Sequence, residues 1–314
     1  MCERSLALAA LALAALATTI AACGSSGGGD DGTNDDAAVD SSTTGDVDGG
    51  CEKCVPADSG TIVDSKIGDA PFEAPGDTGP DPTDRSKCAV DPDKPGVTHR
   101  TAKASTGSGS MKYVGFAPPG YDPKTPISLV VALHGAGDTL DNSFSVVWQS
   151  NATSKNFLVV TPEGSAPIGS GFTWYGSDAN LILDVMDDFA KCYSVDPKRQ
   201  IIHGFSAGGV MAYLIGLEAA ELFAGISISS ADLGTAEAIA GKRLVPGVAA
   251  WLLPLSQTHG TSDTNFPIAQ ARAGRDRMIA AGHTVYWHEF AGGHTTSAAL
   301  VEMTYDDLAS SRAP

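Results

Sequence analysis

The sequence predicts an α/β fold in which a mostly parallel central sheet is covered by helices on both faces. Strand-like and helix-like stretches alternate from about residue 88 to the C-terminus. Several strand-like stretches, such as 127–135, are nearly continuous apolar runs, as expected of parallel strands buried on both faces. The helix-like stretches carry apolar residues at helical spacing along one side, so each can cover such a sheet.

The individual elements follow from the same patterns. Strands are expected at 111–119, 127–135, 157–164, 199–205, 223–231, 251–260 and 284–290. Pro254 should shorten the stretch at 251–260, because proline cannot donate to a sheet ladder. Helices are expected at 178–193, 207–221, 268–282 and 297–310, with Gly282 as the C-terminal cap of the third.

The first 22 residues are expected to be a signal peptide. An apolar run from Leu6 to Ile20 has the length of a signal core and is short for a membrane span. It ends in Ile-Ala-Ala-Cys, which resembles the lipobox of bacterial lipoproteins and implies lipidation of Cys23. A cleaved secretory signal with an incidental cysteine is the alternative. Either way the protein is expected to be exported, anchored to the outer membrane or secreted.

Residues 23–87 are expected to be a disordered tether. The stretch is rich in Gly, Ser, Thr and Asp and holds 15 acidic and 3 basic residues between positions 24 and 86. Such a composition cannot bury a core. Because the whole chain carries a net charge of −17, most of the acidity belongs to the tether. No basic patch remains, and nucleic acid is therefore not expected as a partner.

The remaining cysteines can form disulfides in an exported protein. Cys51 and Cys54 form a C-x-x-C in the tether, where a small local loop is favoured over a redox role. Cys88 opens the globular part and Cys192 ends a predicted helix. We expect these two to pair, although sequence alone does not prove the connectivity.

A serine between two glycines marks the candidate nucleophile. In "IIHGFSAGG", Ser206 follows an apolar strand and precedes a helix. A strand that turns into a helix within a few residues requires small residues on both sides of the turn, and here both are glycine. A helix cap is the alternative role for Ser206.

A serine nucleophile needs a histidine base and an acid that orients it. In parallel sheets reacting groups lie in loops at the carboxyl ends of strands. Asp263 follows the strand that ends near residue 260, and His294 follows the last strand. The order Ser206, Asp263, His294 therefore predicts a catalytic triad.

Other residues compete for these roles. Asp232 follows the preceding strand and could replace Asp263 as the acid. Three further histidines compete with His294 for the role of base, but only His294 falls on a flexible loop in the right order; the three are His259, His283 and His288. His134 and His203 are expected to orient loops beside the serine.

Aromatic residues mark a candidate substrate site. Trp174 and Tyr175 lie in a loop and could stack on a sugar ring or a phenolic acyl group, with core packing as the alternative. For Trp287 core packing is favoured over substrate contact. The sequence contains no H-E-x-x-H, no cysteine–histidine ligand set and no phosphate loop, so neither a metal nor another cofactor is expected.

Four motifs together resemble a known family. "LHGAGD", "VDPKRQIIHGFSAGGVMAY", "HGTSDTNFP" and "GGHTTS" are similar to the exported α/β-hydrolase esterases that include feruloyl esterases, acetylxylan esterases and polyhydroxybutyrate depolymerases. The resemblance covers residues from about 88 to 310 and implies an α/β-hydrolase catalytic domain at 88–314. It implies Ser206 as nucleophile, His294 as base and Asp263 as orienting acid. It also implies oxyanion donors at the backbone N–H groups of Ala136 and Ala207.

The expected activity is hydrolysis of carboxylic esters. The resemblance implies plant-wall polysaccharide esters or a polyester as the substrate. A peptidase of the same fold would use the same groups, and a catalytically inactive binding protein tethered to the cell envelope is the non-enzymatic alternative.

Overall fold

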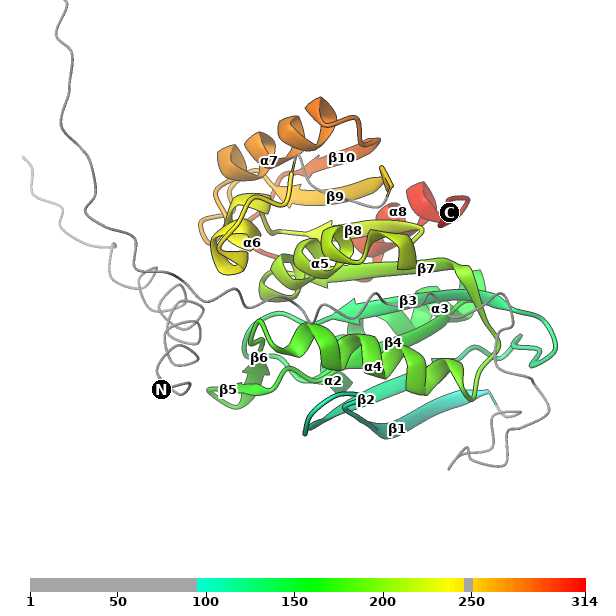
Figure 1. The fold of residues 1–314 in the computed structure, drawn as a ribbon. Coiled ribbons are helices and arrows are strands. Elements are labelled where there is room, and N and C mark those ends of the chain that lie inside the picture. The colour runs from blue at the N-terminus through cyan, green and yellow to red at the C-terminus, as the bar shows by residue number, and fades with distance from the viewer. Residues whose placement is uncertain (1–94, 246–250) are drawn as a thin grey trace, which may run out of the picture. The chain divides into compact units, whose positions relative to one another are not determined.

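A computed structural model describes residues 95–245 and 251–314 of the chain. Its main feature is an eight-stranded sheet with the strand order β1-β2-β4-β3-β7-β8-β9-β10 (Figure 1). The strands are β1 (Gly96–Lys103), β2 (Ser110–Ala117), β3 (Ile127–Leu133), β4 (Leu158–Pro162), β7 (Val195–Phe205), β8 (Gly225–Ser229), β9 (Leu255–Gly260) and β10 (Val285–Phe290). From β4 to β10 neighbouring strands are parallel, whereas β1 and β2 are antiparallel additions at one edge.

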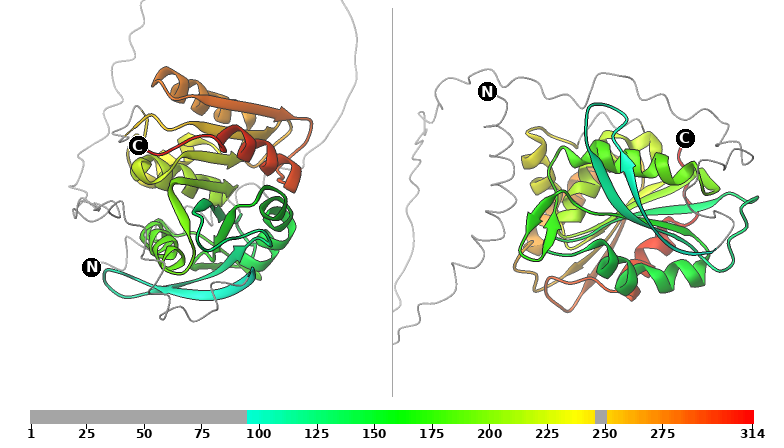
Figure 2. Two further views of the ribbon diagram at one scale, coloured as in Figure 1. Left: turned by 90° about the vertical axis from the view of Figure 1, so that its right-hand side faces the viewer. Right: turned by 90° about the horizontal axis from the view of Figure 1, so that it is seen from below.

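Helices cover both faces of this sheet, as Figure 2 shows from two further sides. One group contains α4 (Asp178–Ala190), α5 (Ala207–Glu218), α6 (Leu233–Ala240) and α7 (Ile268–Ala280), all of which contribute to one apolar core. The other group contains α2 (Leu140–Ser143), the π-helical turn η2 (Phe144–Trp148), α3 (Gln149–Lys155) and α8 (Ala298–Leu308). These surround a second, smaller core. The predicted α/β fold is confirmed.

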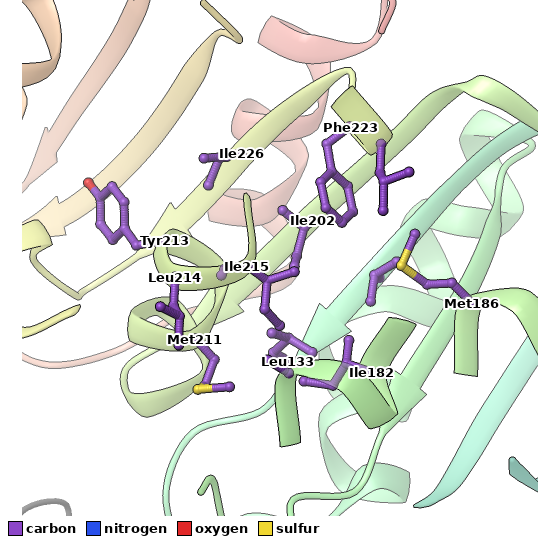
Figure 3. Packing of buried hydrophobic residues seen from close by; sticks show 14 of the residues in the cluster. Leu133, Ile182, Met186, Ile202, Met211, Tyr213, Leu214, Ile215, Phe223 and Ile226 are labelled. Carbon is purple, nitrogen blue, oxygen red and sulfur yellow. The ribbon is translucent and has the colours of Figure 1, made fainter. Parts of the chain in front are cut away.

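Strand β3 contributes side chains to both cores. Leu129, Val131 and Leu133 point into the first core, while Val130 and Ala132 point into the second. Because successive strand side chains alternate between faces, a strand covered on both sides must be apolar throughout. Figure 3 shows part of the first core, where side chains of α4 and α5 pack against the strands.

Several elements were not among those predicted. The edge strand β1 alternates between exposed and partly buried positions, and its sequence GVTHRTAK is largely polar. The α2–α3 segment contains a π-helical turn, which interrupts regular helical spacing. A two-stranded hairpin of β5 (Ala166–Ile168) and β6 (Gly171–Thr173) and helix α6 were also missed. Pro254 precedes β9 and ends the expected strand on that side, as predicted.

Several predictions concern residues outside the described part of the chain. These are the signal peptide, the lipidated Cys23, the tether at 23–87, and Cys51, Cys54 and Cys88. Cys192 is disulfide-bonded, and its pairing with Cys88 stays a prediction. Across residues 95–245 and 251–314, every helix is too short or too polar to span a bilayer.

Candidate active site

Ser206 lies in a sharp turn between β7 and α5, where its backbone has φ +55° and ψ −121°. A non-glycine residue rarely adopts positive φ, and such strain is concentrated at functional sites. A Cβ on Gly204 would overlap the carbonyl oxygen of Gly208, and a Cβ on Gly208 would overlap that of Leu133. Both positions flanking the turn therefore require glycine, for the reason that the sequence suggested.

His294 joins Ser206 to Asp263. Its Nε2 lies 2.8 Å from Oγ of Ser206, and its Nδ1 lies 2.9 Å from Oδ2 of Asp263. A carboxylate can only accept, so Nδ1 carries the hydrogen and Nε2 is left to accept the serine O–H. The three side chains thus form one hydrogen-bonded chain with its basic nitrogen at the serine.

Two loops bring the acid and the base together. Asp263 follows β9 and His294 follows β10, which is parallel to β9. The N–H of Ser262 donates to the carbonyl of Gly292 at 2.8 Å, which ties the first loop to the second. A Cβ on Gly260 would overlap the carbonyls of Gly292 and Gly293. The close approach of these loops therefore depends on glycine at position 260.

The structure separates Asp263 from its competitor Asp232. Asp232 caps α6, with its two carboxylate oxygens accepting from the N–H and the hydroxyl of Thr235 at 2.9 and 2.8 Å. Asp263 accepts from His294 with one oxygen and from the N–H groups of Asn265 and Phe266 with the other, both at 2.9 Å. Asp263 is therefore the acid that reaches the imidazole.

The competing histidines have other partners. Nε2 of His288 lies 2.7 Å from Oδ2 of Asp307 on α8. His283 donates through Nδ1 to the carbonyl of Leu253 at 2.9 Å, at the amino end of β9. His259 is fully buried behind the Asp263 turn. None of these three is hydrogen-bonded to Ser206 within the described residues.

The two predicted oxyanion donors belong to segments next to the serine: Ala207 follows it in the chain, and Ala136 lies in a neighbouring loop. Ala207 is the first residue of α5, and the first N–H groups of a helix have no intrahelical acceptor. Ala136 is exposed in the loop after β3, beside Gly137 with φ +83°. A Cβ on Gly135 would lie 3.5 Å from Cβ of Ser206, so this loop adjoins the serine. The arrangement can accommodate a negative oxygen between loop and helix.

The buried His134 and Trp174 hold the loop that contains Ala136. His134 donates through Nδ1 to the carbonyl of Gly135 at 2.8 Å and accepts the N–H of Gly164 through Nε2 at 3.0 Å. Trp174 donates from Nε1 to the carbonyl of His134 at 2.9 Å, and the two rings lie 4.6 Å apart. Burial lowers the pKa of His134, which favours the neutral form that these contacts require.

The expectation that Trp174 binds substrate is wrong. Its side chain is 0% exposed and its N–H is already used within the protein, so it has no free face for a ligand. Tyr175 is partly exposed in the same loop and stays a candidate. Trp287 donates to Glu289 at 2.8 Å and lies beneath the guanidinium of Arg275, 5.0 Å from its ring centroid. Trp287 is half-buried and belongs to neither apolar core, so the core packing that the sequence favoured is not confirmed.

Three residues at the site were missed. The rings of Phe205 and Phe266 lie 5.0 and 5.7 Å from the imidazole of His294. Ser230, with φ +50°, donates to the carbonyl of Thr295 next to that histidine at 3.2 Å. Phe205 and Phe266 are part of the motifs around Ser206 and Asp263, so their positions could have suggested a role. Nothing in the sequence distinguishes Ser230.

Among the described residues, no group of three or more His, Cys, Asp or Glu side chains is placed to hold a metal ion.

Part of the chain is similar in sequence to known proteins. Residues 179–310 match the phospholipase/carboxylesterase family. The chain is 29% identical over 133 residues to a poly(3-hydroxybutyrate) depolymerase of Ralstonia pickettii, covering 36% of this chain and 27% of the relative. It is 31% identical over 129 residues to feruloyl esterase C of Emericella nidulans, covering 39% and 47%. The chain thus matches less than half the length of either curated relative.

A solved structure supports the same fold. The ferulic acid esterase of the anaerobic fungus Anaeromyces mucronatus superposes with a TM-score of 0.51 and 16% sequence identity, covering 69% of this chain and 90% of that one. Similarity at this level of identity concerns the fold alone. The chain has the α/β-hydrolase fold, and its residues 179–310 match the phospholipase/carboxylesterase family.

Proposed function

We propose that this protein is a serine esterase that hydrolyses carboxylic esters through Ser206, His294 and Asp263. The observation that carries the proposal is the continuous hydrogen-bonded chain from Ser206 to Asp263, with 2.8 and 2.9 Å contacts on the two sides of one imidazole. A serine hydroxyl is nearly inert at neutral pH unless a base accepts its proton. His294 is positioned to accept it.

The proposed reaction has two halves. Oγ of Ser206 forms a bond to the ester carbonyl carbon while its proton passes to Nε2 of His294. The carbon–oxygen bond to the alcohol then breaks, and the alcohol leaves with that proton. Water next attacks the acyl-enzyme with His294 again accepting a proton, which returns to Oγ as the carboxylic acid leaves. The N–H groups of Ala136 and Ala207 would hold the oxyanion in both halves.

Feruloyl or acetyl esters of plant-wall polysaccharides are the substrates we favour. Support comes from the feruloyl esterase of Emericella nidulans, which is 31% identical over the matched 129 residues. Partly exposed aromatic rings at Phe205 and Tyr175 could contact a phenolic acyl group near the serine. The polyester depolymerase of Ralstonia pickettii, 29% identical, supports a polyester as the second candidate substrate.

We infer from the sequence that the protein is exported. It is either secreted or anchored to the outer membrane of the bacterial envelope through a lipid on Cys23.

A peptidase would use the same triad on an amide, and an inactive binding protein would not use it at all. A matched ester and amide substrate would separate the first of these alternatives from an esterase.

The deciding experiment uses the full chain and a Ser206→Ala control. Release of p-nitrophenol from acetate and butyrate esters is followed beside release of ferulate from methyl ferulate and clearing of a polyester suspension. Turnover of methyl ferulate that depends on Ser206 supports a plant-wall esterase. Clearing of the suspension supports a depolymerase. If no ester is turned over and a fluorophosphonate probe fails to label Ser206, the protein is a binding protein.

A further inference from the structure

The carboxylate of Asp263 is held by the backbone of its own turn. Between β9 and α7, Oδ1 accepts from the N–H groups of Asn265 and Phe266, both at 2.9 Å, and Oδ2 accepts from His294. The Asp263 side chain is 0% exposed, so water is not available to replace a lost donor. The Phe266 residue also places its ring 5.7 Å from the imidazole of His294. Its position therefore affects both the acid and the base.

A second histidine is bonded to that same residue. Nε2 of His259, which lies near the end of β9, is 2.8 Å from the carbonyl oxygen of Phe266. A carbonyl oxygen only accepts, so Nε2 of His259 carries the hydrogen. The same nitrogen lies 3.6 Å from Oδ2 of Asp263, outside hydrogen-bond range. His259 is thus directed at the backbone of the turn, while the carboxylate is left to His294.

The other edge of the His259 ring is also defined. The amide nitrogen of Gln257 lies 3.4 Å from Nδ1 of His259 and donates to the carbonyl of Ala231 at 2.7 Å. The hydroxyl of Tyr213 donates to Oε1 of Gln257 at 2.6 Å. Gln257, His259 and Tyr213 are all fully buried. Turning the His259 ring would leave buried polar groups unpaired, so this network specifies one orientation and one tautomer.

We propose that His259 is a positioning residue for the triad, acting through Phe266 on the Asp263 carboxylate. The inference rests on the proposed esterase function and deepens it. With the Phe266 carbonyl bonded to His259, its N–H stays directed at Asp263, and Asp263 stays aligned with Nδ1 of His294. Without that contact the turn can shift, and His294 loses the orientation in which Nε2 faces Ser206. Small displacements of this kind have large effects on turnover.

Two substitutions at position 259 separate positioning from packing. The amide nitrogen of His259→Gln can occupy the place of Nε2 and donate to Phe266. That of His259→Asn reaches only the place of Nδ1 and cannot. We expect kcat for p-nitrophenyl acetate to fall roughly 10- to 100-fold in His259→Asn with little change in KM, and to be largely restored in His259→Gln. The low-field proton resonance of Nδ1–H in His294 should shift or broaden in the first variant and return in the second.

His283→Gln is the matched control. His283 is also buried and also donates to a backbone carbonyl, that of Leu253, but at the amino end of β9. The glutamine removes the donor at Nδ1, so stability should fall while kcat and the His294 resonance stay as in the wild type. Equal kcat values for His259→Asn and the wild type would overturn the inference. Equal losses in His259→Asn and His283→Gln would also overturn it.

Two further measurements keep the outcome decisive. If His259→Asn does not fold, the ¹⁵N shifts of the wild-type histidines decide, because the inference requires the Nε2–H tautomer at His259 and an Nδ1–H tautomer overturns it. Failure of the proposed function is recognised separately. In that case the wild type itself shows no turnover that Ser206→Ala removes, whereas failure of this inference alone leaves that turnover intact.

Discussion

Asp263 and His294 are joined by a 2.9 Å hydrogen bond from Nδ1 to Oδ2, and the second carboxylate oxygen is occupied by two backbone N–H groups. The carboxylate therefore has one orientation, and that orientation leaves Nε2 of the imidazole facing Ser206. Asp263 itself need not exchange a proton. Its contribution is the tautomer and the direction of the ring.

Replacing Asp263 by asparagine should therefore lower kcat/KM for an activated ester by about 10⁴-fold. The amide would donate towards Nδ1 and favour the wrong tautomer. Ser206→Ala should lower kcat for the same ester roughly 10⁶-fold, because it deletes the nucleophile. Steady-state turnover of p-nitrophenyl acetate measures both values.

Asp232→Asn is the control for this comparison. Asp232 caps α6 through Thr235, and asparagine caps helices about as well as aspartate, so this substitution should change stability little. Its turnover per folded molecule should match the wild type. A large loss of turnover in Asp232→Asn beside a nearly silent Asp263→Asn would reverse the assignment of the acid.

Gly208→Ala should destabilise the turn that presents Ser206. The added Cβ would overlap the carbonyl of Leu133, which belongs to the neighbouring strand and cannot move as a side chain would. Overpacking of this kind costs about 1–3 kcal/mol or more, and turnover should fall with it. Gly176→Ala is the control, because a Cβ there has no neighbour within 4 Å. Thermal unfolding with equal midpoints for the two variants would contradict the steric argument.

Trp174→Phe should lower kcat about tenfold while KM changes little. The phenyl ring preserves most of the packing against His134 but removes the donor to its carbonyl, which frees the loop that carries Ala136. A complete loss of one oxyanion donor costs about 10²–10³ in kcat, so a displaced donor should cost less.

Trp251→Phe tests whether that effect is local. Trp251 donates from Nε1 to the carbonyl of Ala220 at 2.7 Å, in a contact unrelated to the loop that carries Ala136. Both variants lose one indole–carbonyl hydrogen bond, so both should lose stability. Only Trp174→Phe should lose turnover. Equal kcat values in the two variants would mean that Trp174 does not support the oxyanion loop.

The extent to which the sequence predicted this molecule depended on how local each signal was. Ser206 and its glycines form one strand–turn–helix unit whose steric requirement is visible in a short stretch of residues. The buried strands have continuous apolar runs, which only a sheet covered on both faces explains. Edge strand β1 lacked such a signal, because half of its side chains face solvent.

Residues that depend on contacts distant in sequence were placed less well. For Trp174 the sequence left both substrate contact and core packing open, because a position in a loop does not determine whether an aromatic ring is exposed. The structure buries it under His134, a residue 40 positions earlier. His259 was set aside because it does not fall on a flexible loop in the right order, and its bond to the Phe266 carbonyl depends on how the Asp263 turn folds back. Patterns of spacing do not contain this information.

The buried His203 should make stability depend on pH. Burial lowers the pKa of His203 to about 3, whereas in the unfolded chain a histidine has a pKa of about 6.5. Between these values the unfolded state binds one more proton than the folded state. This group therefore contributes a loss of about 1.4 kcal/mol of stability for each unit by which pH falls below 6.5 towards 3.

The free energy of unfolding by urea, measured from pH 4 to pH 7, tests this slope in the wild type and in His203→Asn. The asparagine can retain the 2.6 Å contact that Nδ1 of His203 makes with Ser227, but it does not titrate. His203→Asn should be less stable at pH 7, because the ring that packs 4.8 Å from Trp148 is lost. Its stability should nevertheless fall less steeply with acid than that of the wild type. Parallel curves for the wild type and His203→Asn would show that His203 is protonated equally in both states.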